Sequence, residues 1–134
     1  MFEAKVYRIA VTTLGAILQE EHQAREAIQR YNTQRAQASG KVLLPLAPGD
    51  AAAPDLWVVV IQSYLDPARV EPILQSQRPV AFLFSQWHDP LSSIQAEVDA
   101  TVAFRARVQG SYPCVDYRTP REFEEALWEV FERI

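Results

Sequence analysis

Two short runs of hydrophobic residues, Leu56–Ile61 and 80–84, stand out along the chain. Neither run alternates with polar positions, which is typical of strands that are buried on both faces of a parallel sheet. A third run, residues 5–11, is rich in β-branched and aromatic residues and stops at Thr12-Thr13-Leu14-Gly15. This pattern predicts a strand that enters a turn.

Two weaker runs predict strands at the sheet edges. Residues 42–46 contain Pro45, which has no N–H to donate to a neighbouring strand and therefore belongs at an edge. Cys114–Tyr117 is short and partly polar, which suits the opposite edge.

Between the first two predicted strands, hydrophobic residues recur at spacings of three and four, with charged residues on the other face. This spacing predicts a long helix that ends at Ser39-Gly40. Three more helices are expected, because an N-cap side chain precedes a proline at each start. These starts are Asp66-Pro67, Asp89-Pro90 and Thr119-Pro120, the last with Glu122 completing a capping box.

Because helices follow strands repeatedly, the sheet is expected to be parallel. Two hydrophobic central strands and two weak edges predict a flavodoxin-like α/β domain spanning residues 1–134, with a five-stranded sheet in the order 2-1-3-4-5.

One connection is too short for this fold. Residues 47–55 join the second strand to the third, whereas a parallel crossover usually takes a dozen residues or more and a helix. The second helix of the fold is therefore predicted to be missing or reduced. Its loss would uncover the sheet near Trp57 or Val59, where a protein partner or a second copy could dock. Alternatively, the long first helix and the alanines of the loop fill the gap.

Composition narrows the classes of function. The 134 residues carry a net charge of −4 without a Lys/Arg cluster, which argues against a nucleic-acid partner. No hydrophobic run is long enough for a membrane span, and the N-terminus lacks the pattern of a signal peptide. The single cysteine, Cys114, excludes an internal disulfide and a thiolate zinc cluster, so a cytoplasmic protein is expected.

Ligands of open parallel sheets bind beyond the carboxyl ends of the strands, where the winding direction reverses. With the predicted strand order, this crevice lies between the first and third strands and could hold a nucleotide. Trp87 on its rim could stack on a base. The other residues expected to line it are Thr12, Thr13, Gly15, Gln62, Ser63 and Tyr64.

Glu71 is the candidate catalytic residue, as a nucleophile or base, with Asp66 nearby. The competing interpretation makes Asp66 an N-cap and Glu71 a solvated helix residue. His88 and Asp89 form a poor metal-ligand pair. Cys114 is more typical of a small residue packed in the core than of a nucleophile. No metal and no cofactor is predicted.

Several segments resemble one known group of proteins. They are Thr-Thr-Leu-Gly after the first strand, Glu-Glu-His-Gln-Ala-Arg-Glu-Ala-Ile in the long helix, Leu-Trp-Val-Val-Val-Ile, and Arg-Pro-Val-Ala-Phe-Leu-Phe. Phe104-Arg-Ala-Arg-Val and Thr119-Pro-Arg-Glu-Phe add to them. Over most of its length the chain resembles the small bacterial domain related to TIR domains and nucleoside 2-deoxyribosyltransferases.

This resemblance implies an interaction or nucleotide-sensing domain, of the kind found at the N-termini of signalling or defence NTPases. Enzymatic relatives carry a glutamate at the start of the helix after the third strand. Without gaps, its position falls nearer Ala68 than Glu71, which implies that catalysis is lost. The leading hypothesis is therefore a non-catalytic protein-interaction domain. The alternative is an enzyme of nucleotide N-glycosidic bonds, an NAD hydrolase or a deoxyribosyltransferase, that uses Glu71.

Overall fold

The computed structural model describes residues 5–14, 19–46, 53–61, 67–85 and 95–134. The elements follow in the order β1 (Lys5–Leu14), α1 (Gln19–Ser39), β2 (Lys41–Pro45), β3 (Leu56–Ile61), α2 (Pro67–Gln75), β4 (Val80–Ser85), α3 (Gln95–Val108), β5 (Cys114–Tyr117) and α4 (Pro120–Arg133).

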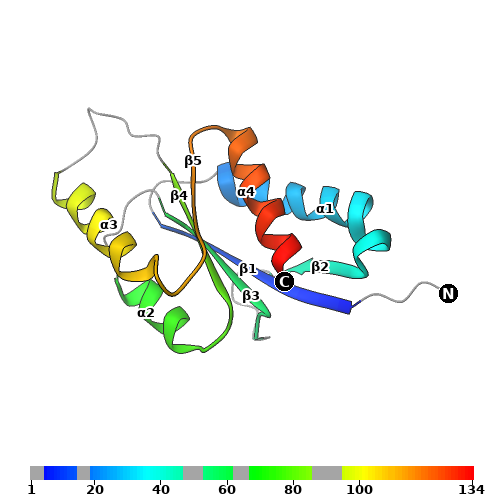
Figure 1. The fold of residues 1–134 in the computed structure, drawn as a ribbon, viewed down its shortest axis with the longest axis horizontal. Coiled ribbons are helices and arrows are strands. Elements are labelled where there is room, and N and C mark those ends of the chain that lie inside the picture. Colours follow the sequence, from blue (N-terminus) through cyan, green and yellow to red (C-terminus); the bar gives the residue numbers. More distant parts are fainter. Residues whose placement is uncertain (1–4, 15–18, 47–52, 62–66, 86–94) are drawn as a thin grey trace.

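The five strands form one parallel sheet in the order β2-β1-β3-β4-β5. Helices α1 and α4 lie on one face of the sheet, and α2 and α3 lie on the other (Figure 1). This is the flavodoxin-like three-layer arrangement predicted from the sequence, and the edge position of the strand with Pro45 is confirmed.

The first strand is longer than predicted. It continues past Val11 through Thr12 and Thr13 to Leu14, which pair with Val59, Val60 and Ile61 of β3. The two polar threonines favour a turn by sequence, but pairing with the fully hydrophobic strand β3 keeps them in the sheet. Leu14 consequently belongs to β1 and not to a turn.

The last helix begins as predicted, with a complete capping box. The backbone N–H of Glu122 donates to Thr119 Oγ1 at 3.1 Å, and the N–H of Thr119 donates back to Glu122 Oε2 at 3.1 Å. Helix α2 continues through Pro72 to Gln75. The predicted caps at Asp66 and Asp89 lie outside the described residues.

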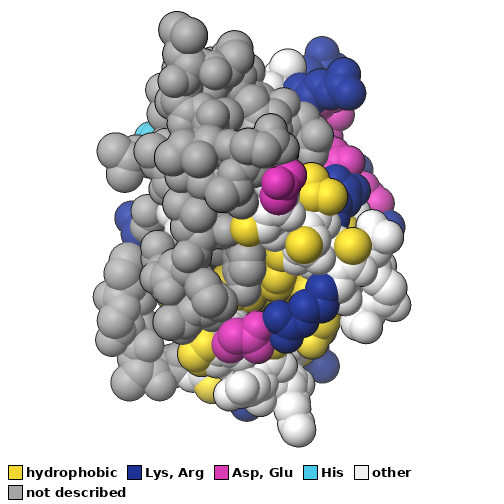
Figure 2. Space-filling view, turned by 90° about the vertical axis from the view of Figure 1, so that its left-hand side faces the viewer, with side chains coloured by type: hydrophobic (Ala, Val, Ile, Leu, Met, Phe, Trp, Pro, Cys, Tyr) yellow, Lys and Arg dark blue, Asp and Glu magenta, His cyan; other side chains and the backbone are white. Residues whose placement is uncertain are grey.

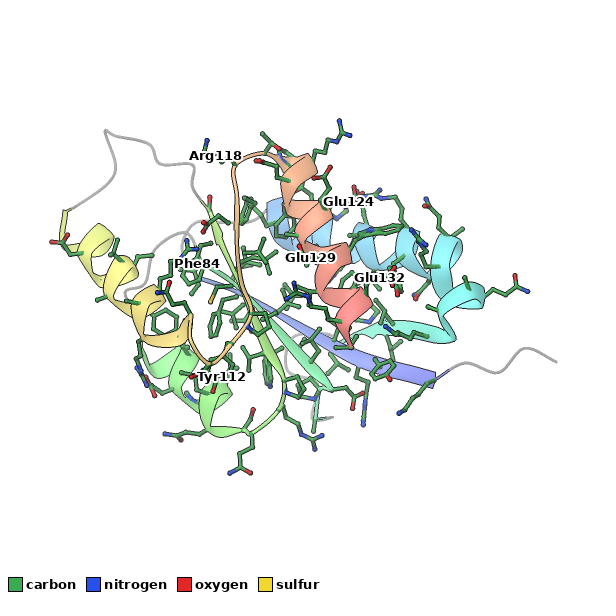
Figure 3. All side chains as sticks on the ribbon, viewed as in Figure 1. Phe84, Tyr112, Arg118, Glu124, Glu129 and Glu132 are labelled. Carbon is green, nitrogen blue, oxygen red and sulfur yellow. The ribbon has the colours of Figure 1, made fainter. Side chains whose placement is uncertain are left out.

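Two hydrophobic cores fill the spaces between the three layers. On the α1 and α4 side, Tyr31 packs edge-to-face against Trp128 and Phe131, with ring centroids 5.4 and 5.5 Å apart. Glu124 and Glu132 extend from α4 (Figure 3) and form ion pairs with Arg30 and Arg35 of α1. These contacts bind the two helices to each other as well as to the sheet.

On the α2 and α3 side, the core is built on β3 and β4. Phe82 stands at its centre and contacts Phe84, Phe104 and Tyr112, with ring centroids 5.5 to 6.2 Å apart. Figure 3 shows Phe84 and Tyr112 on this side of the sheet. The residues of α2 and α3 that complete this core are Val70, Ile73, Phe104 and Val108. Among the side chains that the structure describes, none from β1 or β2 belongs to this core.

The short connection between β2 and β3 is described in part. Residues 53–55 are not helical, and residues 47–52 lie outside the described part of the chain.

Candidate functional site

The structure does not bring the described members of the predicted crevice together. Thr12 and Thr13 are successive residues inside β1, so their side chains point to opposite faces of the sheet. Thr12 pairs with Val59 of the α2 and α3 core, and Thr13 pairs with Val60 of the α1 and α4 core. The other predicted lining residues, Gly15, Gln62, Ser63, Tyr64 and Trp87, lie outside the described residues.

Glu71, the candidate catalytic residue, lies on α2 and bonds to α3. Its two carboxylate oxygens accept from the guanidinium of Arg107 at 2.6 and 3.2 Å. Hydrogen bonding from Arg107, reinforced by its charge, lowers the pKa of Glu71. Figure 2 shows acidic and basic side chains lying against each other beside hydrophobic ones on the α2 and α3 side of the molecule. The geometry is that of a surface ion pair bridging two helices, and a catalytic role for Glu71 stays a prediction.

A polar cluster that the sequence did not predict lies at the carboxyl ends of β4 and β5. The buried Tyr117 donates its hydroxyl to Glu20 Oε1 of α1 at 3.4 Å and is also hydrogen-bonded to the side chain of Ser85. Burial, followed by the negative charge of Glu20, raises the pKa of Tyr117, so its hydroxyl stays protonated as a donor. Because 97 positions separate Glu20 from Tyr117, no local sequence pattern could have revealed the pair.

Cys114 behaves as a packing residue. Its thiol is half-buried against the Phe82 core, and Sγ donates to the carbonyl oxygen of Tyr112 at 3.4 Å. Burial raises the pKa of the thiol, which keeps it protonated and poorly nucleophilic. Within the described ranges, no group of three or more His, Cys, Asp or Glu side chains is placed to hold a metal ion.

The uncovered part of the sheet lies on the first and second strands, whereas the first and third strands were predicted to lack cover near Trp57 or Val59. Val59 is fully buried, because α2 and α3 pack over it, and Trp57 is half-buried beside them. Instead, Val6 of β1 and Leu44 of β2 are 55% and 49% exposed. The prediction that Val59 lacks cover was therefore wrong, since the two helices on this face are centred on β3 and β4.

Val6 and Leu44 belong to one surface. Tyr7, Ile9 and Leu43 pack towards α1 and α4, so the alternate positions of β1 and β2 point to the opposite face. Val6 lies beside Val42, and Arg8 lies beside Leu44 in the sheet. We call the surface formed by the side chains of Val6, Arg8, Val42 and Leu44 the uncovered face. In Figure 1 this end of β1 and β2 extends to the right, away from α2 and α3.

Asp55 sets the border of the uncovered face, just before β3. Its carboxylate accepts from the backbone N–H of Arg8 at 2.8 Å, and its own N–H donates to the carbonyl of Arg8 at 2.8 Å. The side chain thus adds one more hydrogen bond to β1 where β3 has not yet begun. The bond from the Arg8 N–H, with the charges of Arg8 and Arg78, lowers the pKa of Asp55.

Replacing Asp55 with asparagine is expected to lower the free energy of unfolding by about 1 kcal/mol at pH 7, because a charge-assisted bond at a partly exposed site is weakened. A carboxyl with a lowered folded-state pKa stabilises the fold above its unfolded pKa, and this contribution disappears as pH falls through the folded value. The difference between the two proteins should therefore be constant from pH 6 to 8 and shrink below about pH 4. Urea unfolding across this range measures it.

The matched control is Glu125→Gln, which removes an exposed pair with Arg121 on α4 and should change stability by less than about 0.5 kcal/mol. A pH-independent effect of Asp55→Asn would show that the carboxylate charge contributes nothing.

The outer edge of β2 is closed by side chains. Asn32 of α1 accepts from the N–H of Leu43 at 2.8 Å and donates to the carbonyl oxygen of Leu43 at 2.8 Å. The N–H of Lys41 donates to Ser39 Oγ at 3.2 Å, and Pro45 has no N–H. An incoming strand would need these same backbone groups, so the amide of Asn32 occupies the place of a sixth strand.

No protein-family model matches this sequence, and no curated protein matches it either. Among solved structures, the chain is similar to a de novo designed Rossmann fold protein, with 16% sequence identity and a TM-score of 0.38. The match covers 97% of this chain and 100% of the designed protein. At this TM-score the similarity says nothing of function, and the fold class rests on the strand order itself.

None of the helices in the described ranges is long and apolar enough to cross a membrane.

Proposed function

We propose that this chain is a non-catalytic protein-interaction domain of TIR-like fold that binds a protein partner through the uncovered face. The observation that carries the proposal is the exposure of Val6 and Leu44 on adjacent strands, next to the half-buried Val42. In α/β folds, helices normally cover both faces of a parallel sheet. A hydrophobic strip at the surface, with a short crossover where its covering helix would be, supports docking of another protein.

The enzymatic alternative has weaker support. A carboxylate that attacks or stabilises a sugar must be available to the ligand, whereas both oxygens of Glu71 are engaged by Arg107 on the outside of the α2 and α3 layer. The resemblance to TIR-related domains accommodates the interaction role without a catalytic glutamate.

Photo-crosslinking in the cells that naturally make the protein tests this proposal. Benzoylphenylalanine at position 44 should give one discrete covalent adduct with another protein, whereas the same residue at Gln37, exposed on α1, should give none. Adducts of equal yield at both positions, or none at position 44, would overturn the proposal.

A further inference from the structure

We infer that the partner segment bound by the uncovered face is an acidic amphipathic α-helix lying along β1 and β2. This inference rests on the proposed function and names the chemistry of the partner. Three features select this occupant: the dimensions of the face, the closed edge of β2, and the charges at the border.

The uncovered face has the width of one helix. Each strand occupies about 4.8 Å of the width of a sheet, so two neighbouring strands cover roughly 10 Å. An α-helix with its side chains is also roughly 10 Å across. On the same side of the sheet, α2 and α3 cover β3 and β4. A helix over β1 and β2 would continue this layer. Its hydrophobic stripe would meet Val6, Val42 and Leu44.

The edge of β2 disfavours an extended partner. A peptide that binds as an added strand needs the outward N–H and carbonyl groups of β2. The amide of Asn32 already holds both groups of Leu43, and Pro45 supplies no donor. A partner therefore binds more readily on the side chains of the face than on the backbone of the edge. Among the secondary structures, a helix needs no backbone bonds from the protein it docks on.

The border of the uncovered face is positively charged. The positive charges of Arg8 and Arg78 both interact with the carboxylate of Asp55. Arg8 Nε lies 3.6 Å from Asp55 Oδ2. Among the described side chains at this border, two guanidinium groups against one carboxylate leave an excess of one positive charge, and the Arg8 side chain is 44% exposed. Acidic residues flanking the hydrophobic stripe of a helix would complement this border. A second copy docked through the same face would bring two such positive borders into one interface.

Binding of three labelled peptides, measured by fluorescence anisotropy, tests the inference. The first is a helical peptide with a Leu/Ile stripe flanked by Glu, the second has Lys in place of Glu, and the third is the Glu peptide with two central prolines. The wild-type chain should bind the first peptide best, and 0.5 M salt should weaken this binding because it screens the charges.

Two variants locate the binding. Leu44→Lys should weaken binding of the Glu peptide about tenfold or more, which corresponds to 1.4 kcal/mol. Arg78→Glu should reduce or reverse the preference for the Glu peptide over the Lys peptide. Gln37→Lys on α1 is the control for an added charge and should leave binding unchanged. Thermal unfolding of each variant verifies that it is folded.

Equal binding of the Glu and Lys peptides, or tighter binding of the proline peptide, would overturn the helix inference. If no peptide binds while position 44 still crosslinks to a cellular protein, the class of partner is wrong and the interaction domain stands. If light scattering instead shows dimers that Leu44→Lys dissociates, the occupant is a second copy and the helix inference fails.

Discussion

Replacing Phe82 with alanine is expected to lower the free energy of unfolding by about 3–5 kcal/mol. The ring is fully buried in the middle of β4 and contacts three aromatic rings, those of Phe84, Phe104 and Tyr112. Its removal leaves a cavity between the sheet and α3 that the rigid β4 backbone cannot close. Urea unfolding followed by circular dichroism measures the loss, and the slope of free energy against urea should stay unchanged.

Val102 provides the matched control for this prediction. It lies on α3 like Phe104 but is 63% exposed. Val102→Ala should therefore change stability by less than about 0.5 kcal/mol. Similar effects of the two alanine substitutions would contradict the packing of α3 on β4, and with it the account of which strands the α2 and α3 layer covers.

The position of the uncovered face depends on this packing. Because Phe82 and Val59 hold α2 and α3 over β3 and β4, the exposed large hydrophobic residues of the described strands are Val6 and Leu44, at the other end of the sheet. The short β2–β3 connection alone predicted that some part of the sheet lacks its helix. Which strands stay uncovered depends on where α2 and α3 pack on the sheet. The residues of the connection carry no information on the packing of these two helices.

The fold itself was predictable because its determinants are local. The uninterrupted hydrophobic run Leu56–Ile61 identifies a central strand, Pro45 identifies an edge, and Thr119 with Glu122 identifies the start of α4. Each signal lies within one element, and strand order follows from the alternation of elements with right-handed crossovers. The end of β1 was not predictable in this way, since Thr12 and Thr13 favour a turn until β3 is present to pair with them.

The candidate site was harder to predict because its contacts join distant positions. Nothing in the sequence around Asn32, on the polar side of a helix, indicates that it hydrogen-bonds to Leu43. Nothing around Glu20 indicates its hydrogen bond with Tyr117. A side-chain amide in a helix is ordinarily solvated, and only the turn at Ser39-Gly40 brings β2 back along α1. The Gly40 backbone has a φ of 72°, a conformation that residues with a side chain rarely adopt, so this glycine sets the reversal on which the Asn32 contact depends.

Replacing Asn32 with alanine is expected to lower the free energy of unfolding by about 2 kcal/mol, because both backbone groups of Leu43 lose a well-aligned partner at a part-buried site. The amide proton of Leu43 should exchange with solvent faster than in the wild-type chain. Hydrogen exchange followed by NMR measures the rate at this single position, and urea unfolding measures the stability.

Opening the edge should also change how copies of the chain meet. In Asn32→Ala, the outward backbone groups of Leu43 become available to the β2 strand of another copy. Association should therefore increase with protein concentration. As the chains associate, exchange of the Leu43 amide proton with solvent should slow again. Asn32→Asp keeps the acceptor for the Leu43 N–H but loses the donor, and its stability should fall between those of the other two proteins. Gln34→Ala, at an exposed position of α1, is the control and should resemble the wild type.

If Asn32→Ala remains monomeric and its Leu43 amide exchanges at one rate at all concentrations, then Pro45 and the shortness of β2 suffice to keep the edge unpaired. The amide of Asn32 would in that case contribute to stability alone.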